Sequence, residues 1–426
     1  MSRLQSPSSA KDLSLLDWVS FAVAIPIFLL RWLTSLTFQN HGLLHWRQKL
    51  ALTFLRAQRA SFPTRILRWS VRRIPTHTAI TTYCAKHHIP LQSITLPPST
   101  TSHHPSHTIP PPTLHILTPP SSSSPNNNNS SNTNSPTLFY LHGGGYVNPL
   151  RANAHIPFLL ACAAATNPPC SRAIIVEYSL APEHPYPAQL VQSLAALQYT
   201  LTDLSIPAES IILAGDSAGA QLIGAVFAHV VKPCPYFPRL RLDVEKGGRF
   251  RAAVMVSPFV RLLPPPAGED GRGEDGRGGD GKDGKRGSYI MNEKRDYLTW
   301  GQVMGFRQDW AGEEGEVWAN LCGVEARGEG VWDGVFEGQG RVVERVLVTV
   351  GTAEVFLDDV RVFAGECVGA EVVSVKRGGG VEGVKGKRRL LVECKDEAHV
   401  QVALDMAVGY REGSMMRAVV EWLAGV

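Results

Sequence analysis

The feature that most constrains this chain is the pentapeptide Gly215-Asp-Ser-Ala-Gly219, taken together with what surrounds it. Four apolar residues, 211–214 (IILA), precede it, and an alanine-rich stretch typical of a helix follows it. A G-x-S-x-G sequence between a strand and a helix forms a sharp turn that presents the serine hydroxyl at the end of the sheet. The amide of Ala218 would then lie at a helix N-terminus, where it can face a developing negative charge. The pattern predicts Ser217 as a nucleophile, with Asp216 beside it in a supporting role.

A second glycine motif, His142-Gly-Gly-Gly145, follows the apolar strand expected at 137–141 (TLFYL). Three consecutive glycines allow the backbone to turn its amides toward a ligand. Gly143, Gly144 and Gly145 are therefore candidates for an oxyanion-binding loop. His142 is expected to fix this loop through a hydrogen bond rather than to act as a base.

Apolar strands and helices alternate over the rest of the chain. Strands are expected at 137–141, 173–178, 211–214, 252–256, 345–350 and 389–393, and helices at 154–166, 187–201, 218–231 and 414–424. Such alternation predicts the α/β class, with a mostly parallel central sheet and helices on both faces. Ligands of these sheets bind at the carboxyl ends of the strands, which is where the motifs fall.

An acid is expected after Ser217 in the chain, followed by a histidine. Glu354 lies in the loop after the strand at 345–350 and is the favoured acid, because a carboxylate there can orient an imidazole. Asp358 and Asp359 compete with it. They fall at the start of the next helix, where capping and the helix dipole explain acidic residues without chemistry.

The predicted base is His399, which follows the strand at 389–393 and is the only histidine in the last third of the chain. Its position suits proton transfer to and from Ser217. The intervals between the serine, Glu354 and His399 are long, and the Gly-rich segments within them account for the excess length.

Three motifs together resemble the hormone-sensitive lipase family of α/β hydrolases. They are HGGG at 142–145, YSLAPEHPYPAQ at 178–189 and GDSAG at 215–219, and the resemblance covers about residues 136–426 with gaps. It implies an α/β-hydrolase fold with a helical cap. It also implies a triad of Ser217, Glu354 and His399, with Gly144, Gly145 and Ala218 as oxyanion donors and Gly143 shaping the loop.

The chain departs from this family's pattern at two places. The acid is usually Asp in a D-x-L-x-D pattern, whereas this chain has Glu354-Val-Phe-Leu-Asp358, so the carboxylate stands one methylene further out. In the Y-R-L-A-P-E pattern, Ser179 replaces the arginine. Glu183 of the same stretch is expected to hold the surrounding loops together.

The resemblance implies a serine hydrolase that cleaves a carboxylic ester through an acyl-enzyme on Ser217, without a metal or cofactor. The layout is similar to membrane-bound steryl acetyl hydrolases and to secondary-metabolite esterases of fungi, which favours a short-acyl ester, such as an acetate, of a hydrophobic alcohol. Two alternatives stay open. One is an amide hydrolase, such as an arylformamidase, using the same triad. The other is a non-catalytic receptor of the same fold, although the related gibberellin receptors lack the histidine.

Composition indicates the loops outside the sheet, and the family resemblance implies the cap. Residues 41–97 are expected to form an N-terminal cap and lead-in, and 98–135, rich in Pro, Ser, Thr and Asn, to form a low-complexity loop. The catalytic domain is expected at 136–426, with a cap insertion at 259–340 that is disordered over the charged glycine repeat at 264–288. The aromatic residues of this insertion that suit an apolar pocket or lid are Tyr289, Tyr297, Trp300, Phe306, Trp310 and Trp318.

Residues 1–40 differ from the rest of the chain. Residues 13–36 (LSLLDWVSFAVAIPIFLLRWLTSL) are apolar apart from a few polar positions and the charged Asp17 and Arg31. They reach the ~20 residues needed to cross a membrane if Arg31 snorkels, and an amphipathic helix over the active-site mouth is the alternative. Positive charge after the segment favours a cytosolic catalytic domain at a membrane such as the endoplasmic reticulum. Without a spanning helix, the expected location is the cytoplasm.

Overall composition excludes some partners. The net charge is +4 and the basic residues form no stripe with interleaved aromatics, which argues against nucleic acid. The seven cysteines are scattered in or beside apolar runs without metal-ligand spacing. They are therefore predicted to be buried free thiols.

Overall fold

The computed structural model describes residues 13–38, 42–97, 109–120, 135–242, 248–261 and 287–426, apart from 314, 324, 325 and 327–329. A nine-stranded sheet has the order β1-β2-β4-β3-β5-β6-β7-β9-β8. The strands are β1 (Leu91–Thr95), β2 (Thr113–Leu117), β3 (Thr137–Leu141), β4 (Arg172–Glu177), β5 (Ile211–Asp216), β6 (Ala252–Val256), β7 (Val346–Gly351), β8 (Glu371–Val375) and β9 (Arg389–Cys394). β2 pairs antiparallel with β1 and β4. All neighbouring strands in the rest of the sheet, in the order β4-β3-β5-β6-β7-β9-β8, pair in parallel.

The central strands are covered on both faces. Every residue of β3, β5, β6 and β7 is buried, as expected for parallel strands between two helical layers. The edge strands β1 and β8 are largely exposed. These observations confirm the predicted α/β-hydrolase fold with a mostly parallel sheet.

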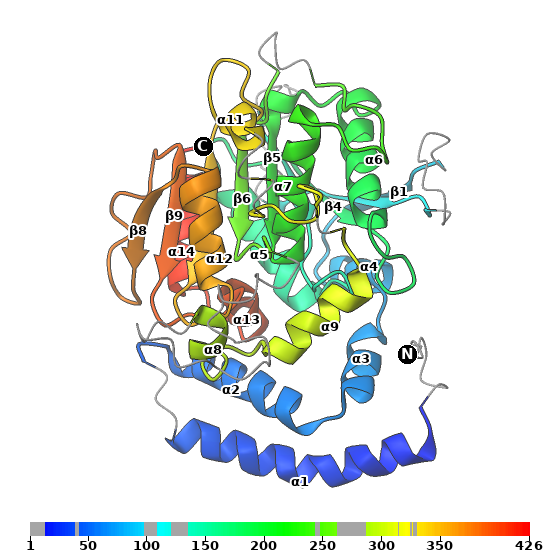
Figure 1. The fold of residues 1–426 in the computed structure, drawn as a ribbon, viewed down its shortest axis with the longest axis vertical. Coiled ribbons are helices and arrows are strands. Elements are labelled where there is room, and N and C mark those ends of the chain that lie inside the picture. Colours follow the sequence, from blue (N-terminus) through cyan, green and yellow to red (C-terminus); the bar gives the residue numbers. More distant parts are fainter. Residues whose placement is uncertain are drawn as a thin grey trace.

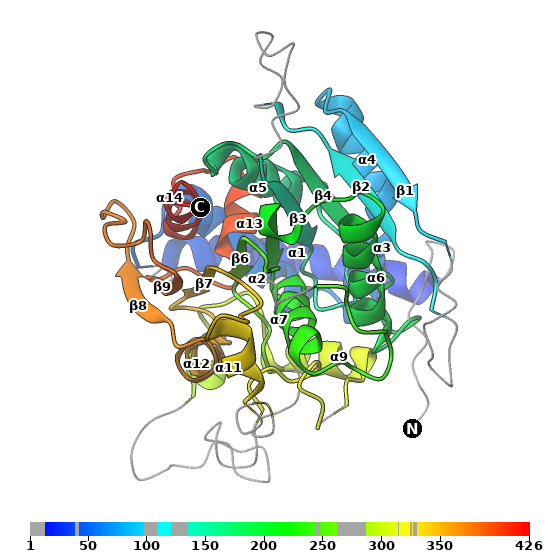
Figure 2. The same ribbon diagram turned by 90° about the horizontal axis from the view of Figure 1, so that it is seen from above.

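Helices pack on each face of the sheet and form two separate apolar cores (Figure 2). One face carries α4 (Thr76–Lys86), α5 (Ala152–Ala165), α13 (Gln401–Ala407) and α14 (Ser414–Leu423). The other carries α6 (Ala188–Thr202), the 3₁₀ turn η3 (Ala208–Ser210), α7 (Ala218–Val231), α11 (Val331–Phe336), α12 (Leu357–Val362) and the π-helical turn η5 (Phe363–Cys367).

A further layer of helices, called the cap below, lies beyond the carboxyl ends of the strands (Figure 1). The cap consists of α1 (Leu15–Phe38), α2 (Trp46–Ser61), α3 (Thr64–Arg72), α8 (Ser288–Met291) and α9 (Trp300–Trp310). It therefore combines the start of the chain with a segment inserted after β6. α1 is its outermost helix and runs along α2 (Figure 1).

Aromatic side chains join α1 to α2. Phe28 and Trp32 both pack edge-on against Phe54, with 5.2 and 5.4 Å between ring centroids. The two charged side chains of α1 also contact the neighbouring helices. Asp17 lies 3.5 Å from an Arg65 nitrogen, and Arg31 donates a hydrogen bond to the backbone of α2. The inner side of α1 is thus bound to the protein through both rings and charges.

The outer surface of α1 is apolar. Leu16, Val23, Leu30 and Leu33 are each more than half exposed. The helix has 24 residues and a mean hydropathy of 1.8, so it is long and apolar enough to cross a membrane by length and composition. A signal sequence near an N-terminus passes the same test.

The described residues correct three of the expected boundaries. The expected loop at 98–135 contains β2, because Leu114 and Leu117 of the sequence TLHIL are buried in the core. The expected lead-in at 41–97 includes α4 and β1, which belong to the main fold. The expected cap insertion at 259–340 ends too late, since α11 packs against α7 at the end of the molecule opposite the cap (Figure 1).

Two further expectations concern composition. The segment 264–288, expected to be disordered, lies outside the described residues up to 286, and Ser288 already begins α8. All seven cysteines are buried and free, as predicted.

Candidate active site

Ser217 lies at the turn between β5 and α7, at the carboxyl end of the sheet. Its backbone has φ 51° and ψ −117°, a conformation that is strained for a residue with a side chain. The helix after the turn comes very close to β3. A Cβ atom on Gly219 would stand 2.0 Å from the carbonyl oxygen of Leu141. The glycine is therefore required for this approach, and the predicted strand–turn–helix context of Ser217 is present.

The structure brings the predicted nucleophile and base together. His399 Nε2 lies 2.9 Å from Ser217 Oγ, which is hydrogen-bond distance. Both side chains are buried. On the other side of the imidazole, His399 Nδ1 lies 3.7 Å from Glu354 Oε2, the separation of an ion pair rather than of a hydrogen bond. Among the described residues, Nδ1 has no hydrogen-bond partner.

Glu354 is completely buried and is held by Ser257, a residue that the sequence did not single out. Ser257 Oγ donates to Glu354 Oε2 at 2.8 Å and accepts the amide of Val400 at 3.1 Å. The serine thus links the loop after β6 to the loops that carry the acid and the base. No motif marks this serine, because its role depends on contacts about 100 or more residues away in the chain.

The competing acids lie elsewhere. Asp358 is half exposed, accepts the amide of Ser288 at 2.7 Å and lies 3.8 Å from Arg361. Asp359 accepts a hydrogen bond from Tyr289 at 2.6 Å. Neither carboxylate is in contact with the ring of His399 within the described part of the chain.

The glycine loop after β3 faces Ser217. Gly144 and Gly145 have φ values of +124° and +62°, which residues with side chains rarely adopt. The carbonyl of Gly144 accepts hydrogen bonds from the backbone and the side chain of Asn148. The Gly143 amide donates to Asp216 Oδ1 at 2.9 Å. The amide of Gly143 is thus engaged within the loop, the part that the family resemblance implies for it, and is not offered to an oxyanion.

Asp216 anchors this loop from below. Besides the amide of Gly143, it accepts a hydrogen bond from the Tyr140 hydroxyl and lies 3.5 Å from His155 Nε2. Burial alone would raise the pKa of Asp216, but His155 and the hydrogen bonds lower it to about 2. The carboxylate is therefore charged and holds the amide of Gly143.

His142 and Glu183 also occupy supporting positions. His142 Nδ1 donates to the carbonyl of Gly143 at 2.7 Å, and its ring stacks on Tyr178 at 4.4 Å. Burial lowers the pKa of His142 to about 4, so the ring is neutral. Glu183 forms a two-pronged pair with Arg72 of α3, at 2.8 and 2.5 Å. It joins its loop to the cap without contacting Ser217.

A second buried carboxylate, Asp296, lies beside His399 and was not predicted. It accepts the amides of Val355 at 2.9 Å and of His399 at 3.3 Å, as well as two amides of its own loop. Burial raises its pKa to about 6, while the charge of His399 lowers it and that of Glu354 raises it further. It stands in the polar stretch NEKRD, and its partners are 59 and 103 residues away, so only the folded chain reveals its position.

The site opens into a small pocket of about 120 Å³. Its floor is formed by the glycine loop, Ser217 and His399, and its roof by side chains of α2, α9 and α13. Of the six aromatic residues expected to form a pocket or lid, Tyr297 and Phe306 line this pocket. Trp310 instead stacks on Tyr146 at 4.8 Å between ring centroids, and Tyr289 binds Asp359. Most of these rings pack the cap on the core.

Comparison with known proteins places the fold in a family. A family model described as alpha/beta hydrolase fold, Abhydrolase_3, matches residues 138–378. Carboxylesterase NlhH of Mycobacterium tuberculosis is 37% identical over 102 residues, 23% of this chain and 30% of that protein. An acetyl esterase of Salmonella paratyphi B is 37% identical over 94 residues, 21% of this chain and 28% of that protein. The chain thus spans under a third of the length of these curated relatives.

Solved structures share the fold at low sequence identity. Carboxyl esterase 2 of the fungus Tuber melanosporum is 15% identical, with a TM-score of 0.52 over 79% of this chain and 86% of that chain. An esterase from the bacterial hormone-sensitive lipase family is 20% identical, with a TM-score of 0.53 over 89% of this chain and 98% of that chain. Since the family model matches more than half of the sequence, the chain belongs to the alpha/beta hydrolase fold family, in agreement with its resemblance to the hormone-sensitive lipase family.

Proposed function

We propose that this protein hydrolyses carboxylic esters through an acyl-enzyme on Ser217. The observation that carries the proposal is the 2.9 Å separation between Ser217 Oγ and His399 Nε2 at the end of the sheet. His399 takes the proton of Ser217 as the oxygen attacks the ester carbonyl, and returns it to the alcohol as the bond to that alcohol breaks. A water molecule, deprotonated by His399, then attacks the acyl-enzyme and releases the carboxylic acid.

Charge in this reaction is stabilised from two sides. Glu354, buried behind the imidazole, favours the charged form of His399 during the transfer. The amides of Gly144, Gly145 and Ala218 surround the position of the oxyanion. The Ala218 amide lies in the first turn of α7, where amides have no acceptor within the helix. Donors fixed in advance in this way need no reorganisation when the negative charge forms.

The acyl group is proposed to be short. The pocket next to Ser217 and His399 measures only about 120 Å³, which suits an acetyl group better than a long chain. The matched relatives include a carboxylesterase and an acetyl esterase by their names. The second candidate, an amide hydrolase, would use the same residues.

Membrane association is proposed through the outer surface of α1. Its exposed side chains are mostly apolar, and its two charged residues contact α2 and Arg65 of α3. Since α1 runs along α2 and contacts it through several rings, the packed helix suits a position lying in the membrane surface. Of the two expected arrangements, this one favours a helix that covers the active-site mouth. It does not favour a separate helix that spans the membrane.

A fluorophosphonate probe tests the nucleophile, because it reacts covalently with activated serines. Wild-type protein should be labelled, and Ser217→Ala should lose the label together with turnover of 4-nitrophenyl acetate, a loss on the order of 10⁶-fold. Ser70→Ala, an exposed serine of α3, serves as the matched control. Labelling that persists in Ser217→Ala would refute the assignment of the nucleophile, and an unlabelled wild type would refute the proposed hydrolase activity.

A comparison of turnover on a panel of acyl esters with turnover on N-formyl and N-acetyl amides separates the two candidate reactions.

A further inference from the structure

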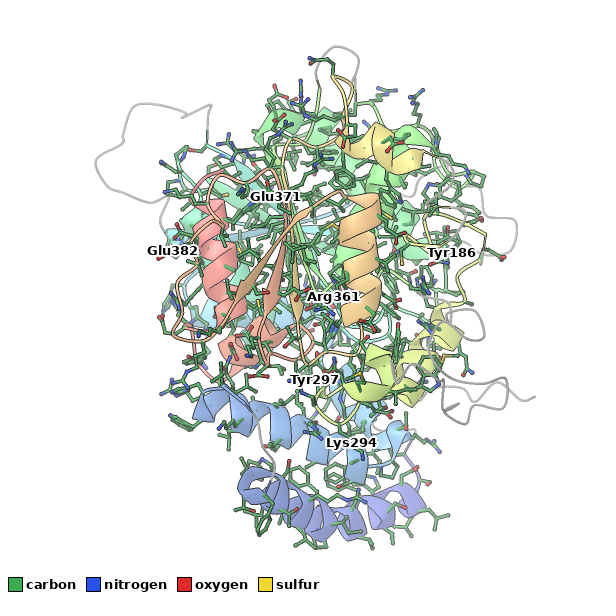
Figure 3. All side chains as sticks on the ribbon, turned by 60° about the vertical axis from the view of Figure 1, so that its left-hand side comes forward. Tyr186, Lys294, Tyr297, Arg361, Glu371 and Glu382 are labelled. Carbon is green, nitrogen blue, oxygen red and sulfur yellow. The ribbon has the colours of Figure 1, made fainter. Side chains whose placement is uncertain are left out.

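A larger cavity adjoins the pocket at Ser217. It has a volume of about 700 Å³ and lies between α1, α2, α3, α9 and the loop before α9. The two spaces have five lining residues in common: Arg59, Asn148, Arg151, Tyr297 and Phe306. Figure 3 shows Tyr297 between the strand ends and α2, with Lys294 further toward α1. A molecule that fills both spaces would therefore place one end at Ser217 and the other under the cap helices.

The wall of this cavity has an excess of positive charge. Its cationic side chains are Arg31, Arg56, Arg59, Arg68, Arg151 and Lys294, and its carboxylates are Glu293 and Asp296. Both carboxylates are engaged with backbone amides, Glu293 with that of Trp300 and Asp296 with four others. Arg68 is paired with Asp309. Asp296 also favours the charged forms of Arg56 and Arg59. The described wall nevertheless carries six cationic side chains against two carboxylates.

Arg59 is the deepest of these cations. Its Nη1 donates to the carbonyl of Tyr297 at 3.3 Å and to Gln302 Oε1 at 2.9 Å, and the guanidinium stands over the Tyr297 ring, 4.7 Å from its centroid. All of these partners are neutral. Burial lowers the pKa of Arg59 to about 10, and the charge of Arg151 contributes to the decrease. Arg59 therefore remains charged, although its buried surroundings disfavour the charged form of the side chain.

Arg151 precedes α5 and lines both spaces. Its side chain is accessible, yet desolvation lowers its pKa, because the solvent that reaches it is confined to the cavity. Within the described part of the chain, neither Arg59 nor Arg151 makes an ion pair. The charge of Asp296 favours the charged form of Arg59, but its carboxylate is held by backbone amides. An anion bound directly between the two guanidinium groups would therefore still lower the free energy.

We infer that this cavity binds an anionic group carried by the substrate, with the guanidinium groups of Arg59 and Arg151 as its partners. On the basis of the proposed ester hydrolysis, the substrate is a short-acyl ester of a large amphiphilic alcohol that bears a carboxylate, phosphate or sulfate. The acyl group occupies the small pocket, and the acidic end lies under the cap. Arginine suits this task because its planar fork binds such oxyanions through two parallel hydrogen bonds.

A pair of matched esters tests the inference: an ω-acetoxy fatty acid and its ω-acetoxy fatty amide, which differ only in the charge at the far end. Wild-type protein should prefer the acid by about 10- to 100-fold in kcat/KM, the range expected for hydrogen bonds between charged groups. In Arg59→Gln and Arg151→Gln the ratio should fall toward one, chiefly through KM. Arg151→Lys should keep part of the preference. Arg411→Gln, an exposed arginine outside the cavity, should keep the full ratio.

Probe labelling and vesicle sedimentation show which part of the proposal is wrong if the expected preference is not found. Fluorophosphonate labelling of each variant shows that it is folded and reactive, so a labelled wild type with no preference for the acid would overturn this inference alone. An unlabelled wild type would overturn the proposed function instead. Sedimentation with phosphatidylglycerol or phosphatidylcholine vesicles tests the other source of anions. If the arginine variants lose binding to phosphatidylglycerol while the ester ratio stays unchanged, the cavity takes a lipid headgroup and the substrate inference is wrong.

Discussion

The inner and outer walls of the active site are held together by different interactions. The inner wall, formed by the glycine loop, Ser217, Glu354 and His399, belongs to the ends of the strands and is fixed by buried hydrogen bonds. The outer wall is formed by cap residues, including Arg59 and Tyr297, whose contacts are cation–π and neutral hydrogen bonds around a cavity. The inner wall therefore contains the residues proposed to carry out the reaction, whereas the outer wall contains residues that can select the substrate.

The largest expected effect is on the inner wall, at Glu354. Glu354→Gln keeps the size of the side chain but removes the charge that stabilises the imidazolium, and should lower kcat by about 10⁴-fold. Asp358→Asn is the matched control and should stay within a few-fold of wild type, because Asp358 accepts the amide of Ser288, is half exposed and does not contact His399. Steady-state turnover of 4-nitrophenyl acetate measures both. Equal losses in the two variants would contradict the choice of acid.

A second change on the inner wall acts through the backbone. A Cβ atom on Gly143 would lie 2.2 Å from Asp216 Oδ2, so Gly143→Ala must shift the glycine loop. Misplacing the oxyanion donors should reduce kcat by about 10²- to 10³-fold, with little change in KM. Gly365→Ala, where a Cβ atom meets nothing within 4 Å, is the control. Wild-type kcat in Gly143→Ala would show that the loop tolerates the shift and has no such role.

The junction between the two walls should respond to pH. Glu397 accepts the amides of Ser414 and Met415, at 2.6 and 3.0 Å, and lies 3.5 Å from the amide nitrogen of Gln48 on α2. Burial raises the pKa of Glu397 to about 7 from an ordinary 4.5. The folded protein therefore binds this proton more tightly than the unfolded chain does. Its contribution to stability is complete below about pH 4.5 and is lost as the pH rises through about 7.

Urea denaturation at several pH values measures this contribution. Between about pH 5 and pH 8 the free energy of unfolding should fall by up to roughly 3 kcal/mol, and Glu397→Gln should flatten the slope. Glu412→Gln, an exposed glutamate in the same region, should leave it unchanged. A slope that survives in Glu397→Gln would assign the pH dependence to other groups, such as Asp405, whose pKa is also raised by burial and by Glu397.

The smallest effect on the chemistry is expected at the outside of the cap. Leu30→Ser and Leu33→Ser change exposed side chains of α1 and should alter folding stability by less than about 0.5 kcal/mol. They should, however, reduce cosedimentation of the protein with lipid vesicles, since each leucine contributes about 1.5–3 kcal/mol when buried in lipid. Val372→Ser, an exposed apolar residue on β8, is the control. Unchanged cosedimentation in both leucine variants would remove α1 as the contact.

The sequence predicted the inner wall far better than the outer one. The central strands are continuous apolar runs, and the glycine and serine motifs stand where these strands end. Local chemistry therefore indicates both the fold and Ser217. The edge strands β1 and β8 were missed because they are largely exposed, and β2, which lies next to β1, was missed because it is embedded in Pro- and Ser-rich sequence.

The outer wall carries no comparable local pattern. Arg59 and Arg151 are separated by a large part of the chain and look like ordinary surface charges until the cap folds over the sheet. Asp296 and Ser257 likewise bind partners that are distant in sequence. The roles of such residues can be recognised only once the chain is folded. The end of the cap insertion before α11 likewise follows only from the packing of the folded chain.

The position of α1 has a kinetic consequence. Arg31, Thr34 and Ser35 of this helix belong to the cavity wall. A lipid surface around α1 would therefore lie next to the cavity. With α1 in a lipid surface, an ester dissolved in that lipid would meet the cavity without crossing bulk water. Turnover would then follow the mole fraction of the ester in the lipid, and adding inert lipid would slow the reaction at constant total ester.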